Sequence, residues 1–202
     1  MRRSVPIVAA LVLLSATPAA AATTEVSIGD SFFSPDTISR RAGGSVHWAR
    51  SSGSVLSHNV RENHLLFRSG NITSGTIDFT RIFSAGTFHF YCEQHGSPSG
   101  GMDGLVKVKP RIAAAPSGLK FTVRWANAQS NTGEVFDVQY RVGSGPWKDW
   151  KKNTSAEKGV FGANGKPVGA KDGTKYSFRA RSQMAGDDTS ASGWSPRTWF
   201  TV

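Results

Sequence analysis

Short extended runs, each closed by a turn of Gly, Pro, Asn or Ser, fill the sequence from residue 24 onward and limit the possible folds most. β-Branched and aromatic residues are frequent in these runs, and no long stretch repeats apolar residues at helical spacing. A helical bundle is therefore disfavoured, and the sequence predicts an all-β protein. The runs that we expect as strands are 24–28, 45–48, 75–83, 87–91, 119–125, 135–142, 175–181 and 199–202.

A stretch of small residues bracketed by prolines, KPRIAAAPS at 109–117, divides the chain into two parts of similar texture. A chain of 202 residues has room for two small domains. We expect residues 23–110 and 117–202 to form two β-sandwiches, joined by a linker over 111–116. Because no self-similarity relates the two parts, two different sandwiches are predicted.

Residues 1–22 have the layout of a secretory signal peptide. Arg2 and Arg3 precede an apolar run over 5–14, and small residues follow it up to Ala22. The apolar run is too short to cross a bilayer, which takes about 20 apolar residues, so we expect no integral membrane span. The sequence thus predicts a secreted, periplasmic or cell-surface protein of a bacterial host.

The chain is basic, with 24 Lys and Arg residues against 14 Asp and Glu residues and a formal net charge of +10. Most of this excess lies in residues 112–202, which hold 13 basic and 7 acidic side chains. The lysines there are scattered and form no dense basic helix with base-reading side chains. We therefore expect no nucleic-acid partner, and interpret the charge as favouring solubility and loose attraction to acidic polymers.

A single cysteine, Cys92, excludes an intramolecular disulfide and stands in FYCEQHGSPSGGM beside His95 and Met102. His58 stands upstream in SHNV. A thiolate, two imidazoles and a weak thioether are the donor set of a blue-copper electron-transfer site. We expect Cys92 to end a strand and a turn to bring His95 beside it. The glycines would let Met102 approach axially, and His58 would come from a neighbouring strand.

Other interpretations of these residues stay open at this point. A lone Cys in a β-protein is usually a small buried hydrophobe, and a lone His is more often packed or exposed than a ligand. Zinc is disfavoured against copper by Met102, because zinc prefers closed sets of Cys and His. The remaining histidines, His47, His64 and His89, are interpreted as packing or solvent-facing side chains.

Residues 24–109 resemble a cupredoxin of the plastocyanin and halocyanin kind, through SHNV, AGTFHFYCEQH, GMDGLV and the opening VSIGDSFFSP. The resemblance implies a blue-copper sandwich with His58, Cys92 and His95 as equatorial ligands and Met102 as the axial ligand. It also implies that His95 is the electron port. The interval from His95 to Met102 is longer than in plant plastocyanins. Arg50 stands where many relatives have an Asn that holds the ligand loop, so a different partner is expected to hold it.

Residues 117–202 resemble a fibronectin type III module. The similarity lies in FTVRW, in FDVQYR with the two Trp residues after it, in GTKYSFRAR and in SGWSP. It implies that Tyr176 is the residue of a tyrosine corner. Such modules are spacers or binding surfaces, so the implied partner is a cell-surface or polysaccharide ligand, although the aromatic residues are interpreted mainly as core.

Together these features predict an exported, monomeric protein with one type 1 copper that carries single electrons to or from a redox protein. A copper carrier, or an extracellular binding or adhesion protein on a cupredoxin scaffold, is the alternative. An enzyme is not expected, because a second copper cluster would need His-x-His pairs and the sequence has none. A carrier would exchange copper readily with chelators, whereas an electron-transfer protein would hold it.

Overall fold

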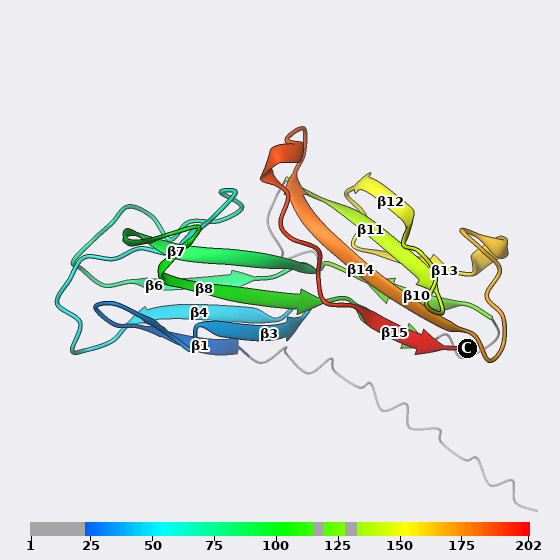
Figure 1. Ribbon diagram of the computed structural model, residues 1–202, viewed down its shortest axis with the longest axis horizontal. Coiled ribbons are helices and arrows are strands. Elements are labelled where there is room, and N and C mark those ends of the chain that lie inside the picture. Colours follow the sequence, from blue (N-terminus) through cyan, green and yellow to red (C-terminus); the bar gives the residue numbers. More distant parts are fainter. Residues whose placement is uncertain (1–22, 115–118, 128–132) are drawn as a thin grey trace, which may run out of the picture.

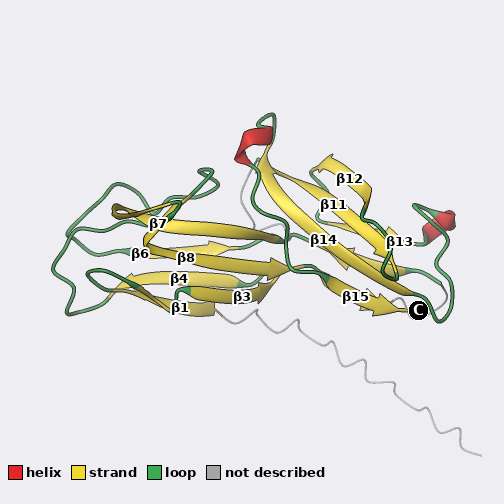
Figure 2. Cartoon of the chain, viewed as in Figure 1, coloured by secondary structure: helices red, strands yellow, loops and turns green. Residues whose placement is uncertain are grey.

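The computed structural model describes residues 23–114, 119–127 and 133–202, which form strands and loops with only two short 3-10 helices (Figures 1 and 2). The predicted all-β fold is confirmed. The predicted signal peptide over 1–22 and the end of the predicted linker, 115–116, lie outside the described residues. Within the described ranges, no helix is long and apolar enough to cross a membrane.

Two four-stranded sheets form the first sandwich. One has the order β2-β1-β4-β6 and the other the order β3-β8-β7-β5, and the pairs β1–β4 and β3–β8 are parallel. The strands are β1 (Thr23–Ile28), β2 (Phe33–Ser34), β3 (Thr37–Arg41), β4 (Ser45–Arg50), β5 (Arg61–Glu62), β6 (Asp78–Ile82), β7 (Gly86–Ser97) and β8 (Gly100–Lys109).

Aromatic side chains fill the space between these two sheets. Trp48 of β4 is fully buried, and its ring lies 5.6 Å from Phe79 of its own sheet and 5.3 Å from Phe90 of the opposite sheet. Strict alternation along β8 buries Met102, Gly104 and every second residue up to Val108. Burying one such large apolar side chain contributes about 1.5–3 kcal/mol, so this core fixes which face of each strand points inward.

The second sandwich packs a three-stranded sheet, β13-β10-β9, against a four-stranded sheet, β12-β11-β14-β15. Its elements are β9 (Arg111–Ala114), β10 (Phe121–Arg124), β11 (Glu134–Val142), β12 (Lys148–Thr154), β13 (Lys158–Phe161), β14 (Lys175–Met184), β15 (Thr198–Thr201) and the 3-10 helices η1 (Ala163–Gly165) and η2 (Asp188–Ser190). Residues 111–114, expected as linker, are thus a strand that pairs with β10.

Buried aromatic residues also form the core of the second sandwich. Phe161 contacts Trp150 and Phe178 edge to face, with ring centroids 5.4 and 5.0 Å away. Tyr176 is buried, and its hydroxyl accepts a hydrogen bond of 3.0 Å from the backbone N–H of Lys171. The Tyr176 ring is therefore anchored to the backbone five residues before it.

Backbone hydrogen bonds join the two sandwiches. Thr87 of β7 exchanges two of them with Gly193, at 2.8 and 2.9 Å, and the N–H of Ala85 donates to the carbonyl of Trp125 at 2.6 Å. Figure 1 shows the start of β7 meeting the end of β14 at this junction. The second sandwich therefore continues the hydrogen bonding of the first at one end of β7.

A buried ion pair lies at the same junction. The guanidinium of Arg81, in β6, pairs with the carboxylate of Glu134, in β11, and both side chains are at most 5% exposed. Ser84 also donates to Glu134, while Arg81 donates to the carbonyl of Leu66 and stacks on Phe67. Burial raises the pKa of Glu134, and the positive charge of Arg81 opposes that rise. The Glu134 carboxylate is thus bound by two side chains of the first sandwich, whereas Arg81 also has contacts within its own sandwich.

We predict that Arg81→Met lowers the free energy of unfolding by about 3–5 kcal/mol, because it leaves the Glu134 carboxylate buried without its partner. Glu134→Leu is expected to lower the free energy of unfolding by a similar amount. The double variant, which removes both charges, should recover much of the loss. Urea unfolding of the full chain measures all three, and additive losses in the double variant would contradict a coupled pair.

His47 bridges two acidic side chains across three adjacent strands of the first sheet. Its Nδ1 lies 2.5 Å from a carboxylate oxygen of Glu25, and its Nε2 lies 2.6 Å from one of Asp78. The hydrogen bond that His47 donates to Glu25, and next the one that it donates to Asp78, raise the pKa of His47 above its ordinary value of 6.5. The sequence interpretation of His47 as a packing or solvent-facing residue missed both partners.

Because folding raises the pKa of His47, the folded chain binds its proton more tightly than the unfolded chain. The stabilisation is fully present below about pH 6.5 and is lost as the pH rises through the raised value. We therefore expect His47→Gln to lower stability at pH 5.5 and to have much less effect at pH 9. Thermal unfolding at both values tests this, and equal losses would contradict it.

Candidate metal centre

A large bulge in β7 brings Cys92 and His95 to one place. Tyr91 pairs with Asp103 and Gly96 pairs with Gly101, so residues 92–95 stand opposite the single residue between those partners, Met102. β7 was expected to end at Cys92, but it continues to Ser97 because its last residues pair with the start of β8. The extra residues bend the strand outward.

Glycine is required where the hairpin closes after the bulge. A Cβ on Gly96 would lie 2.5 Å from the carbonyl oxygen of Met102, and a Cβ on Gly101 would lie 2.7 Å from that of His95. Gly101 also has a φ of 97°, a backbone conformation that residues other than glycine rarely adopt. The close approach of these two backbones sets the spacing between His95 and Met102.

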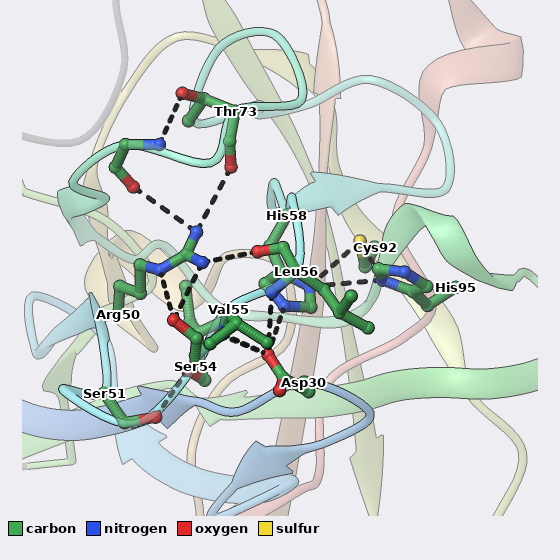
Figure 3. Close-up of polar contacts among 12 residues, drawn as sticks. Asp30, Arg50, Ser51, Ser54, Val55, Leu56, His58, Thr73, Cys92 and His95 are labelled. Atoms are coloured by element: carbon green, nitrogen blue, oxygen red, sulfur yellow. Dashed lines mark hydrogen bonds and ion pairs between the residues drawn. The ribbon is translucent and has the colours of Figure 1, made fainter.

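Three donor atoms from these segments face one another (Figure 3). The Sγ of Cys92 lies 3.7 Å from Nδ1 of His58 and 3.6 Å from Nδ1 of His95, and the two nitrogens are 3.2 Å apart. A point equidistant from the three atoms lies about 2.0 Å from each, close to zinc bond lengths of about 2.0–2.1 Å to imidazole and about 2.3 Å to thiolate. The three groups therefore fit a metal ion without rearrangement.

Burial prepares the imidazole of His58 for metal binding. His58 and Cys92 have no exposed surface, while His95 is half-buried. Burial, and next the nearby His95, lower the pKa of His58 below its usual value. The ring is therefore neutral at neutral pH, which leaves a nitrogen lone pair for a metal. His58 lies in a loop bridged to Thr73, and not in the strand that the sequence predicted.

Arg50 holds the loop that leads to His58. At the end of β4, its guanidinium donates to the carbonyl of Ser54 at 2.9 and 3.2 Å and to that of Leu56 at 2.6 Å. A further bond of 3.3 Å reaches the carbonyl of Thr73, whose backbone is bridged to His58 (Figure 3). Arg50 thus contacts both segments around His58, and none of these bonds reaches the loop of Cys92 and His95, for which the sequence predicted a different partner.

Asp30 holds the same loop from the other side. One of its carboxylate oxygens accepts hydrogen bonds from the hydroxyl of Ser54 and from the N–H groups of Val55 and Leu56, at 2.7, 2.7 and 2.9 Å. These bonds, that from Leu56 first, lower the pKa of Asp30 to about 2. The same oxygen lies 3.7 Å from the buried Nε2 of His58 (Figure 3). A carboxylate therefore faces the ring nitrogen that points away from the cluster.

Asn59 ties the loop of His58 to the strand of Cys92. Its side chain donates to the carboxylate of Glu93 and accepts a 3.0 Å hydrogen bond from the N–H of Glu93. Arg68 adds a 2.6 Å ion pair to the same carboxylate. The residues next to two of the three donors are therefore joined directly, which fixes the distance between the segments.

The fourth predicted ligand, Met102, is buried, and it lies opposite the bulge that carries Cys92 and His95. Its position between the paired residues places its backbone beside the cluster. Axial ligation by its thioether remains a prediction. The other two histidines lie beside acidic side chains. Nε2 of His89 is 2.6 Å from a carboxylate oxygen of Asp103, and Nδ1 of His64 is 3.4 Å from one of Glu62. Neither histidine belongs to the cluster.

Exposed apolar side chains lie on the segments that hold the cluster. Val55 and Leu56, in the loop before His58, are 76% and 43% exposed, and Phe32, which follows Asp30 by two residues, is 55% exposed. The resemblance implied an electron port at His95, but the sequence did not predict these apolar side chains, because single exposed apolar residues in loops carry no periodic pattern.

Comparison with known proteins finds likeness in structure alone. No protein-family model matches the chain, and no curated sequence is similar to it. Amicyanin from Paracoccus versutus is 25% identical over 46% of this chain and 84% of its own, with a TM-score of 0.35. Pseudoazurin from Hyphomicrobium denitrificans is 20% identical over 43% and 75%, with a TM-score of 0.34. Plastocyanin from Dryopteris crassirhizoma is 21% identical over 42% and 99%, with a TM-score of 0.33.

We predict that Arg50→Gln loosens the loop before His58, since a shorter neutral side chain cannot reach the carbonyls of Ser54, Leu56 and Thr73 together. The free energy of unfolding should fall by about 1–3 kcal/mol. Amide exchange at Val55 and Leu56 should accelerate while exchange in the second sandwich stays unchanged. Arg50→Lys, which keeps the charge, should show most of the same effect, and full rescue by Lys would contradict the proposed hydrogen bonding.

Proposed function

We propose that this protein binds one copper ion through His58, Cys92 and His95, with Met102 as the axial ligand, and carries single electrons. The observation that carries the proposal is the convergence of one thiolate sulfur and two imidazole nitrogens, 3.2 to 3.7 Å apart. A His, His, Cys set with a weak Met is the donor set of blue-copper sites. Copper at such a site would take up and release one electron reversibly.

Copper is favoured over zinc by the chemistry of the fourth side chain. Zinc in structural sites takes four Cys or His ligands, and the cluster offers three. The side chain opposite the bulge is a thioether, Met102, which is a soft and weak donor suited to copper.

The chain's own contribution is to hold the donors in one arrangement. His58 is fixed by the bonds that Arg50 and Asp30 make to its loop, and the Asn59–Glu93 link fixes it relative to β7. Complete burial of Cys92 shields the thiolate from oxidants in solution. A site held this way changes little between two oxidation states, which favours fast electron exchange.

The proposed partner is a second redox protein that docks around His95. Among the three donor residues, His95 is the one that is only half-buried, so its ring is the nearest approach from solvent. Val55, Leu56 and Phe32 supply exposed apolar surface on the neighbouring segments. Apolar contact with few charges suits a short-lived complex, because it forms without strong ion pairs that would slow release.

We further propose that the second sandwich is a fibronectin type III-like module that positions the first. Sheets of three and four strands, the buried Trp125, and the hydrogen bond between Tyr176 and the backbone of Lys171 support this assignment. The apolar run over 5–14, with its flanking residues, supports export of the chain. A monomer is proposed for the whole chain.

We propose that the protein is a carrier of electrons and not an enzyme. The sequence contains no His-x-His pair for a second copper cluster. A copper carrier is the alternative, and exchange separates the two functions. An electron carrier should retain copper against a chelator through repeated oxidation and reduction. Rapid loss of copper to the chelator would instead favour a function in copper delivery.

We predict that the full chain, given one equivalent of Cu(II), develops an intense visible band from thiolate-to-copper charge transfer. Cys92→Ser should abolish the band, because Cys92 is the single thiol of the chain. His58→Ala should remove it or convert it to a weaker, shifted band. Absorption spectroscopy over the visible range, with parallel titration by Zn(II), measures these outcomes.

His64→Ala is the matched control, since His64 lies outside the cluster and is exposed. It should leave the band unchanged. Met102→Leu should keep the band and shift the reduction potential upward, because a weak donor is removed. A colourless Cu(II) protein, or a band that survives in Cys92→Ser, would contradict the proposed site.

A further inference from the structure

A hollow outside the metal-binding cluster lies at the junction of the two sandwiches. It is a recess of about 440 Å³ lined by five basic side chains and by no acidic one; the five are Arg40, Arg41, Lys107, Lys109 and Arg111. A second hollow of about 350 Å³ shares Arg41 and Lys109 with it and adds Arg197 and Trp199. We refer to the two hollows together as the basic recess.

The parallel pairing of β3 and β8 gathers these charges. Arg41 is directly opposite Lys109, and Ser39 is directly opposite Lys107, so Arg41, Lys107 and Lys109 share one face of the sheet. Like charges placed opposite each other destabilise a sheet. Figure 1 shows that β3 and β8 end beside β15, which adds the cations and the indole of the second sandwich.

Nothing within the described ranges neutralises this charge. None of the six basic side chains forms an ion pair with another described residue. The Nε atoms of Arg40 and Arg111 are buried and have no hydrogen-bond partner among those residues. These two nitrogens have almost no exposed surface, so a ligand would contact the other nitrogens of the guanidinium groups and the lysine ammonium groups. Guanidinium groups bind oxyanions well, so the recess has the charge of an anion site.

We propose that the basic recess binds an anionic oligosaccharide through its carboxylate or sulfate groups. A hollow of about 440 Å³ has the size of a small-molecule pocket and is too small for a nucleic-acid duplex. Trp199 is 56% exposed at the edge of the recess, and the Nζ of Lys175 lies 4.3 Å from its ring centroid. The indole offers a flat apolar surface for a sugar ring beside cations for its acidic groups.

Single-stranded nucleic acid is the competing polyanion. Proteins that bind single strands present several aromatic side chains in a row, on which successive bases stack. Here Trp199 and Phe200 line the recess, but Phe200 packs against the core of the second sandwich, so Trp199 is the exposed ring of the two. The recess is also separated from the metal-binding cluster by the length of β8, about 20 Å from Met102 to Lys109 at about 3.3 Å per residue. Binding there would leave the cluster accessible.

Isothermal titration of the full chain with a hexamer of galacturonic acid and a sulfated hexasaccharide, at 50 and 150 mM salt, tests the proposal. The triple variant R41Q/K107Q/K109Q should bind at least tenfold more weakly. The matched triple variant K148Q/K151Q/K158Q removes the same charge from exposed positions of β12 and β13, and should bind within twofold of the wild type. Near-ultraviolet circular dichroism verifies that each variant is folded.

Trp199→Ala separates sugar contact from charge attraction. It should weaken the binding of both oligosaccharides severalfold and leave the weak binding of inorganic sulfate unchanged. Three results would overturn the proposal: absence of binding to both oligosaccharides at 150 mM salt, an equal loss in the matched triple variant, or equally tight binding of a single-stranded DNA of the same charge. The last result would assign the recess to nucleic acid.

Discussion

The pairing of β7 with β8 is the constraint on which the rest of the structure depends. Its regular part buries Phe90 and Val106 in the first core, and its bulge presents Cys92 and His95 opposite Met102. At the other end of the same strand, Thr87 bonds to the second sandwich. The core, the donor cluster and the domain junction therefore share one hydrogen-bonded ladder, and a slip of one residue would disturb all three.

Much of this arrangement can be predicted from local features of the sequence. Runs of β-branched and aromatic residues with turn residues between them predicted strands, and motif chemistry predicted that His58, Cys92 and His95 would meet. Those predictions succeeded because strand propensity and soft donor atoms are local properties. The length of β7 could not be predicted, since Gly96 and Ser97 become strand only through pairing with residues that follow.

Contacts between distant segments that involve no recognisable motif could not be predicted from the sequence. Arg50 bonds to carbonyl groups, which every residue has, so nothing in the sequence marks Leu56 or Thr73 as its partners. The basic recess is equally hidden, because its cations come from strands far apart in the chain. The sequence drew attention to the basic excess of residues 112–202, whereas five of the six cations of the recess precede residue 112.

The Arg81–Glu134 pair makes the two sandwiches interdependent. A chain cut within residues 111–116 would leave an arginine on one fragment and a glutamate on the other, each facing water where it now faces its counter-ion. Apolar surface around Phe67 and Phe83 would be uncovered with the arginine. Neither half is therefore an interchangeable building block. A different sandwich joined to either half would have to supply the missing charge at the same place.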